Sequence, residues 1–225
     1  MNEPDPERLS IVRECMENYE VGEAEAEWPN NILSRRTVVY RDGTIARDGD
    51  AVSTQIDGDE LALCRRLAEE AAELMRGVSV GMGSQADTAF YPFFIAGGRS
   101  SPPVAAIDEP LMRTCFGGTI FPQATITAEP FSKETVWWNE VLLDGEESGE
   151  AYFIPWTGMI DWFSNHSAFT AAAFVRIGDP LLLAALPDEA SPDGTVIAGC
   201  VLPRLALGLT RNGSLVGLFG TVVSG

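Results

Sequence analysis

The last part of the chain constrains the fold most strongly. Residues 195–223 are rich in Val, Leu and Gly, and the pair Asn212-Gly213 interrupts them with residue types that favour a tight hairpin turn. A half-exposed strand alternates apolar and polar side chains, but a polar face is nearly absent here. The segment therefore predicts closing strands that lie in the middle of a sheet.

Two helices are predicted near the N-terminus. An Asp-Pro pair at 5–6 supplies an N-cap and a proline at the first helical position, and apolar residues then recur at helical spacing over 6–20. Asp57 caps a second helix over 59–76, with Glu60 three residues on as in a capping box. Both helices have one apolar stripe, so each is expected to pack against a core.

Shorter elements are predicted from apolar alternation and from turn residues. Arg41-Asp42-Gly43 joins two short strands, 37–40 and 44–47, into a hairpin. Further strands are expected at 88–96, 104–107, 119–126 and 168–177, short helical segments at 110–115 and 157–165, and a loop at 187–194.

The segment 132–143 is ambiguous because it is apolar on both of its faces. Ser132 provides a cap for a helix that runs through Leu143. From residue 135 onward the same sequence also fits a strand that pairs with 151–155 across the loop 144–150. We favour the strand.

Together these elements predict an α+β protein with a mixed or antiparallel sheet, two main helices near the N-terminus and a β-rich C-terminal half. At 225 residues the chain fits one domain, 1–225, better than two. The best candidate for a weak seam is 97–103, where Gly-Gly and Pro-Pro flank a short polar run.

The charge balance separates classes of partner. Thirty-three acidic residues against fifteen basic ones give a formal charge of −18, which repels nucleic-acid backbones and anionic membrane surfaces. The same field attracts a basic protein. An acidic surface poor in lysine is also what salt adaptation produces, and the excess of Arg over Lys fits a GC-rich coding bias, so charge alone does not establish a partner.

No cofactor or metal site is predicted. The four cysteines lack the close pairs that metal and redox motifs need, and they are expected to be reduced. The run 81–86 has the letters of a dinucleotide-binding loop, but phosphate binding requires a helix after it, and the next segment is expected to be extended. The N-terminus does not resemble a signal peptide and no apolar run is long enough to span a bilayer, so a soluble, cytoplasmic protein is expected.

His166 is the only histidine, so any mechanism that needs an imidazole must use it. Asp161, five residues earlier, is its candidate partner, and a small hydrolase built on these two residues or on a pair of carboxylates is one functional hypothesis. A single histidine beside aromatic residues is more often structural. We therefore assign no catalytic residue.

The segment 131–169 is the candidate functional region, because it holds four of the five tryptophans, the only lysine and many carboxylates. The tryptophans are either core residues or an exposed aromatic patch with an acidic rim, of the kind that favours protein partners. The predicted binding residues are Trp137, Trp138, Glu146, Glu147, Glu150, Trp156 and Trp162.

The leading hypothesis from sequence is a non-catalytic binding protein that holds a protein partner, preferably a basic one. An immunity protein, an antitoxin-like protein or a chaperone-like inhibitor has this physical profile. A structural or assembly subunit is the remaining alternative, because the apolar closing strands would suit assembly, and oligomerisation stays open.

Overall fold

The computed structural model describes residues 3–16, 32–50, 56–82, 88–97, 105–178 and 200–224. Within these ranges, five antiparallel strands form a central sheet in the order β3-β7-β6-β5-β4. The strands are β3 (Tyr91–Ile95), β4 (Ile126–Glu129), β5 (Phe169–Ile177), β6 (Cys200–Thr210) and β7 (Leu215–Ser224). The α+β class with an antiparallel sheet, predicted from the sequence, is confirmed.

The hairpin of β6 and β7 occupies inner positions of this sheet, as its apolar sequence predicts. Leu209 pairs with Leu215 next to the turn, where Gly213 has a φ of 85° that glycine adopts without steric cost. Successive strand residues point to opposite faces, and Leu205 and Ala206 are both fully buried. The hairpin is therefore covered on both faces.

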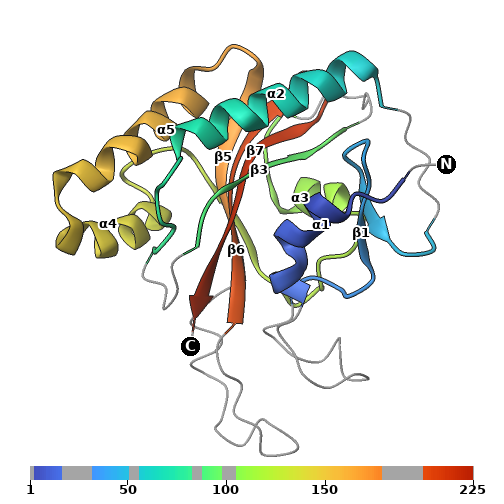
Figure 1. The fold of residues 1–225 in the computed structure, drawn as a ribbon, viewed down its shortest axis with the longest axis horizontal. Helices are drawn as coiled ribbons and strands as arrows, with labels where there is room; N and C mark the ends of the chain where they lie inside the picture. Colours follow the sequence, from blue (N-terminus) through green and yellow to red (C-terminus); the bar gives the residue numbers. More distant parts are fainter. Residues whose placement is uncertain are drawn as a thin grey trace, which may run out of the picture.

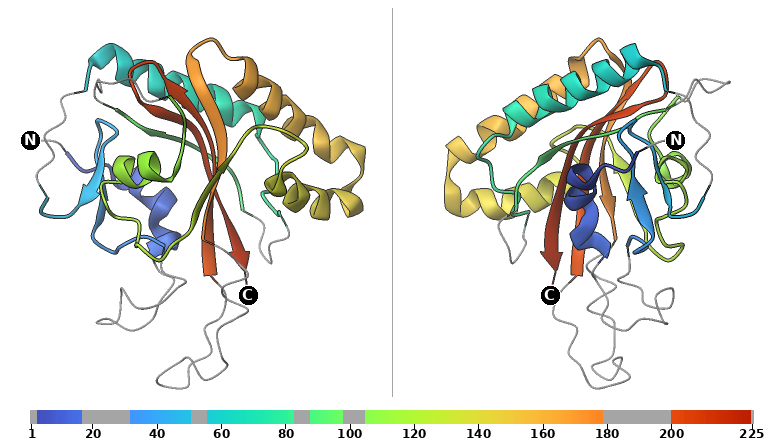
Figure 2. Two further views of the ribbon diagram at one scale, coloured as in Figure 1. Left: turned by 180° about the vertical axis from the view of Figure 1, so that it is seen from behind. Right: turned by 45° about the vertical axis from the view of Figure 1, so that its right-hand side comes forward.

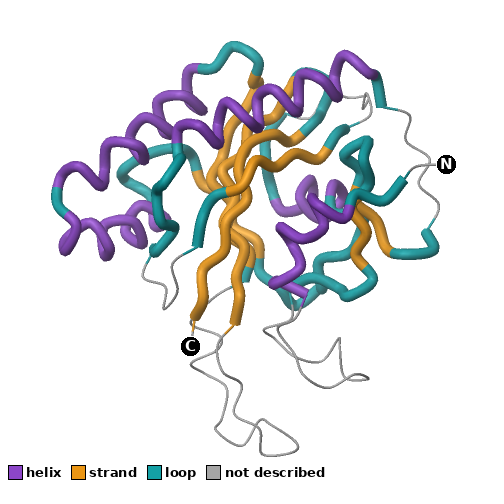
Figure 3. Tube along the Cα trace, in the orientation of Figure 1, coloured by secondary structure: helices purple, strands orange, loops and turns teal. Residues whose placement is uncertain are grey.

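Helices cover one face of the sheet and the N-terminal elements cover the other (Figures 1 and 2). On the first side lie α2 (Gly58–Leu74), α4 (Val136–Ser148) and α5 (Phe153–Asn165). On the second side lie α1 (Pro6–Arg13), its 3₁₀ extension η1 (Glu14–Met16), α3 (Glu109–Cys115) and the hairpin of β1 (Thr37–Val39) and β2 (Ile45–Arg47). The short 3₁₀ helix η2 (Glu150–Tyr152) joins α4 to α5, and this helical hairpin projects past the sheet (Figure 3).

Both N-terminal helices begin where the sequence predicts. The side chains of Asp5 and Asp57 each accept a hydrogen bond from a backbone N–H in the first turn. Glu60 does not complete a capping box: it is buried, and its two oxygens accept hydrogen bonds of 2.7 Å from Thr210 Oγ1 and Asn212 Nδ2. Glu60 thus fastens α2 to the β6–β7 turn. Of the helix predicted over 6–20, residues 17–20 lie outside the described residues.

The strand predicted over 135–143 is wrong, because the segment is the helix α4, and the partner predicted at 151–155 belongs to η2 and α5. The prediction failed because of which side chains α4 buries. Trp137, Trp138 and Val141 face the core, whereas Val136 and Leu143 are exposed. An apolar pattern on both sides of a helix has no clear helical period.

The strands predicted at 104–107 and 119–126 are also wrong. Residues 105–107 have no regular structure, and Ile120 forms only an isolated bridge with Leu33 before β4 begins. The helical turn predicted at 110–115 is confirmed as α3, and the hairpin predicted at 37–47 is confirmed as β1 and β2. Most of the predicted seam and the loop predicted at 187–194 lie outside the described residues. Within those residues, no helix combines the length and the apolar character needed to cross a bilayer.

Candidate functional site

The tryptophans of the candidate region lie mostly in the core. Trp137 and Trp156 are fully buried and Trp138 is 5% exposed, whereas Trp162 is half-buried. Trp137 stacks on Phe174 of β5 with ring centroids 4.4 Å apart, and its Nε1 donates to a backbone carbonyl. The core interpretation is confirmed for the first three tryptophans. They have almost no surface to offer a partner, so an exposed aromatic patch is the wrong description of this region.

Aliphatic side chains, not rings, reach the surface there. Within the described ranges, four of the five exposed large hydrophobic side chains belong to the helical hairpin. They are Val136 (55% exposed), Leu142 (38%), Leu143 (62%) and Ile154 (71%). A surface helix normally turns charged residues outward, so this group is a candidate interaction surface.

The helical period explains how the three exposed aliphatic side chains of α4 come together. Residues seven apart lie on the same side of a helix, so Val136 and Leu143 share the solvent face of α4. Leu142 follows Trp138 by one turn and precedes Gly145, and these positions lie on the side of α4 that packs against Phe153 of α5. Leu142 is therefore next to the seam between the two helices.

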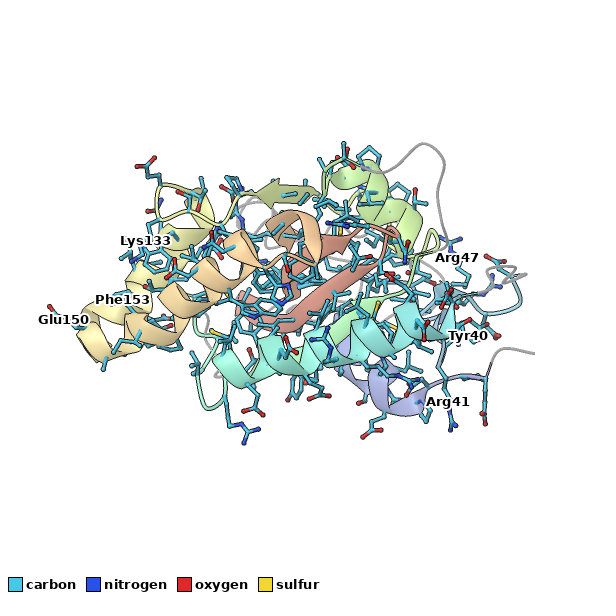
Figure 4. The ribbon with its side chains drawn as sticks, turned by 90° about the horizontal axis from the view of Figure 1, so that it is seen from above. Tyr40, Arg41, Arg47, Lys133, Glu150 and Phe153 are labelled. Carbon is cyan, nitrogen blue, oxygen red and sulfur yellow. The ribbon has the colours of Figure 1, made fainter. Side chains whose placement is uncertain are left out.

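Carboxylates surround the exposed aliphatic residues. Residues 131–166 contain seven acidic residues and a single lysine, Lys133. Glu134, Glu150 and Asp161 are exposed, whereas Lys133 Nζ lies 5.3 Å from the ring centroid of Trp138. Figure 4 shows Glu150 pointing away from the body at the tip of the helical hairpin. We call the group Val136, Leu142, Leu143, Ile154, Glu134, Glu150 and Asp161 the hairpin surface.

Glu146 and Glu147, two of the predicted binding residues, belong to the last turns of α4, but their side chains are not among those that the structure describes. Their backbone position next to Leu143 is compatible with the predicted acidic rim. The helix adds to this negative potential, since the unpaired carbonyls at its C-terminal end carry partial negative charge and its last turn contains no basic residue.

A buried ionic network holds α4 against the sheet. Glu140 of α4 contacts Arg176 Nη1 at 2.8 Å through one oxygen and Arg204 Nε at 3.1 Å through the other. Arg176 of β5 and Arg204 of β6 are cross-strand neighbours, and Arg204 is only 1% exposed. Burial lowers the pKa of the Arg204 guanidinium and the charge of Glu140 opposes this change. The carboxylate thus bridges two adjacent cations.

Glu129 of β4 extends the same network. It contacts Arg176 at 3.0 Å, and its other oxygen accepts a 2.9 Å hydrogen bond from Val136 N at the start of α4. The position of α4, and with it the hairpin surface, depends on these four charged residues. Sequence reasoning missed them. The available signal was Arg204, which stands inside an almost unbroken apolar run.

His166 and Asp161, the weak catalytic alternative, are not joined. His166 follows α5, and its Nδ1 accepts a 3.2 Å hydrogen bond from Ala168 N. Its Nε2 lies 3.8 Å from an oxygen of Glu70 on α2. Asp161 is exposed, and its backbone carbonyl accepts a 2.9 Å hydrogen bond from Asn165 Nδ2. His166 therefore links the end of α5 to α2.

Within the described ranges, the remaining motifs give no chemical site. The glycine-rich run at 81–86 is followed by β3 and not by a helix, which removes the helix N-terminus that a dinucleotide needs. Residues 83–87 are outside the described ranges. Among the residues that the structure does describe, no group of three or more His, Cys, Asp and Glu is arranged to hold a metal ion.

Comparison with known proteins adds no identification, since the chain matches no protein-family model and no curated protein. The fold defines an α+β protein with an antiparallel sheet, and its candidate site is a surface on a helical hairpin.

Proposed function

We propose that this protein is a non-catalytic binding protein that holds another protein, preferably a basic one, through the hairpin surface. The observation that carries the proposal is the concentration of exposed aliphatic side chains on α4 and α5, among acidic residues. Apolar residues supply affinity when water is excluded from them, and the surrounding charges select the partner and speed its approach.

Two further observations support a binding role. The chain carries a formal charge of −18, which favours encounter with a cationic protein. The ionic network of Glu129, Glu140, Arg176 and Arg204 fixes α4 on the sheet, so the hairpin surface is presented on a rigid element. A rigid surface loses less conformational entropy on binding than a loop does.

The apolar closing strands, which suggested an assembly subunit, have an explanation within the chain. Leu207 of β6 and Leu218 of β7 are fully buried between the two layers that cover the sheet. Their apolar character therefore requires no second molecule. The hydrolase hypothesis has no supporting contact between His166 and Asp161.

The experiment is capture of a partner from extract of the source cells with the immobilised full-length protein, followed by site-specific cross-linking. A photo-reactive residue at position 143 or 154 should cross-link the captured protein, and one at Glu69, on the exposed side of α2, should not. Neutral substitution of Leu143 and Ile154 by Gln should lower capture about tenfold. Equal capture by the wild type and this double variant would exclude the hairpin surface as the binding surface.

Charge reversal tests the acidic part separately. Replacing Glu146, Glu147 and Glu150 by Lys should weaken capture and reduce its dependence on salt between about 0.1 and 0.5 M. The control is a matched triple reversal of exposed carboxylates on α1, η1 and α2, namely Glu7, Glu14 and Glu69. If both triple variants lose capture to the same degree, net charge and not the hairpin surface determines binding.

A further inference from the structure

We infer that the element of the partner held on the hairpin surface is a cationic amphipathic helix that lies along α4. This inference rests on the proposed function and deepens it, because it assigns both the secondary structure and the charge pattern of the bound segment. It follows from the spacing of the exposed aliphatic side chains, from the distribution of charge around them and from the state of the β3 edge, an alternative docking element.

The spacing fits a helix. Val136 and Leu143 are separated by two turns of α4, a distance of about 10 Å along the axis. Leu142 widens this row toward α5, and at this seam a Cβ added to Gly145 would overlap the ring of Phe153. A partner helix that packs along α4 presents side chains at intervals of three, four and seven residues, which match such a row.

The outer face of α5 has open space at Gly158. Gly158 follows Ile154 by one turn, and a Cβ built on Gly158 would meet no atom within 4 Å. Asp161 is one turn further along the same face. On this face of α5 an exposed apolar side chain is therefore followed by open space and then by a carboxylate.

The charge pattern assigns the sign of the partner. The exposed carboxylates Glu134 and Glu150 stand before and after α4, so the aliphatic row has an acidic residue at each end. The C-terminal carbonyls of α4 attract cations as well. At the first end the exposed Lys133 offsets Glu134, so the complementary segment has an apolar row in the middle and its Lys or Arg residues at the end that lies over Glu150. A second copy of this chain does not fit, because each copy carries a charge of −18.

Strand addition is the other common way to bind a segment, and the exposed edge of β3 is poorly suited to it. Pro92 has no N–H to donate, and the guanidinium of Arg8 already donates to the carbonyl of Phe94. Ala96 N, just beyond the strand, donates to Gly43 O at 3.1 Å. The β3 edge is thus closed by the chain itself, whereas the solvent face of α4 is open.

The test uses the full-length protein and two synthetic peptides of about eighteen residues with the same Leu and Lys content. In one peptide the leucines recur at positions i, i+3, i+4 and i+7, and in the other the order is scrambled. Binding is measured by fluorescence anisotropy. The patterned peptide should bind the wild type at least about tenfold more tightly than the scrambled one, with helix formation on binding by circular dichroism.

Two variants locate the bound peptide. Leu143→Gln should weaken binding of the patterned peptide about tenfold, and the double variant Glu134→Gln/Glu150→Gln should weaken it and reduce its salt dependence. Glu69→Gln on α2 is the control and should bind within about twofold of the wild type. Equal binding of the two peptides, or an unchanged affinity in Leu143→Gln, overturns the inference.

The outcomes separate the inference from the proposed function. If the patterned peptide has no advantage but a cross-linker at position 143 still captures a cellular protein, the helical partner is wrong and the binding role stands. If cross-linking at 143 and 154 also fails, both are wrong. If light scattering gives a dimer that Leu143→Gln dissociates, a second copy occupies the surface and the inference is overturned.

Discussion

Replacing Glu140 by Gln is the most direct test of how the hairpin surface is positioned. The substitution preserves the shape of the side chain and its ability to accept a hydrogen bond, but it removes the negative charge. Glu140 has one oxygen 2.8 Å from Arg176 Nη1 and the other 3.1 Å from Arg204 Nε. The variant therefore leaves two adjacent guanidinium groups without the carboxylate that separates their charges.

The expected cost follows from burial. Removing one member of a buried ion pair costs about 3–5 kcal/mol, because the remaining charge stays desolvated without a partner. Arg204 is 1% exposed and bears the full effect, whereas Arg176 keeps its 3.0 Å contact with Glu129. The side chains of Glu140 and Arg176 are each 17% exposed, so water relieves part of the cost. We expect the free energy of unfolding to fall by about 3 kcal/mol, the lower end of this range.

The assay is urea-induced unfolding at neutral pH, followed by the fluorescence of the buried indoles. Trp137 and Trp138 lie on α4 itself and report its release from the sheet. Glu69→Gln serves as the surface control, with an expected change below about 0.5 kcal/mol. The double variant Glu140→Met/Arg204→Met removes the buried charges together and should recover most of the lost stability, since apolar side chains of similar volume can replace a buried pair.

A loss below about 1 kcal/mol for Glu140→Gln would refute this reasoning, because an exposed ion pair contributes that little. A double variant as unstable as the single one would also refute it, because unpaired charge would then not be the cause. Hydrogen exchange adds a local check: α4 amides should lose more protection than those of α2 in the variant.

Three further outcomes are expected. Gly145→Ala should lower the free energy of unfolding by about 1–3 kcal/mol, because its new Cβ would overlap the ring of Phe153, whereas Gly158→Ala, with no atom within 4 Å, should raise it by up to about 1 kcal/mol; equal effects in urea unfolding would contradict the close packing of α4 on α5. Burial raises the pKa of the Cys64 thiol from 9.0 to about 11, so the unfolded thiol ionises at a lower pH than the folded one. Stability is therefore unaffected below pH 9 and falls as pH rises from 9 to 11, with a total loss of about 2 kcal/mol; Cys64→Ala should flatten this alkaline fall in stability, and an unchanged slope would argue against a desolvated thiol. Arg8→Ala should cost about 2 kcal/mol and increase aggregation measured by light scattering, because the guanidinium closes the β3 edge; a variant that stays as monodisperse as the wild type would show that the edge is protected in another way.

The sequence by itself determined the elements whose pattern is local. α2 was predictable because Cys64, Leu67 and Ala71 recur at helical spacing behind the Asp57 cap. The β6–β7 hairpin was predictable from its Asn212-Gly213 turn, and its inner position followed from the missing polar face. In each case the local pattern specified what is buried, one stripe of α2 and both faces of the hairpin, so the neighbours did not need to be known.

Tertiary structure decided the arrangement of α4 and of the candidate site. Because Val136 and Leu143 are as apolar as the buried Val141, the local pattern does not specify which side of the segment faces the core. That choice depends on Glu140 meeting Arg204, 64 positions away in sequence. Contacts between residues so distant in the chain leave no periodic pattern in either segment. For this reason only the folded protein shows that the indoles of α4 point inward and that its aliphatic side chains point outward.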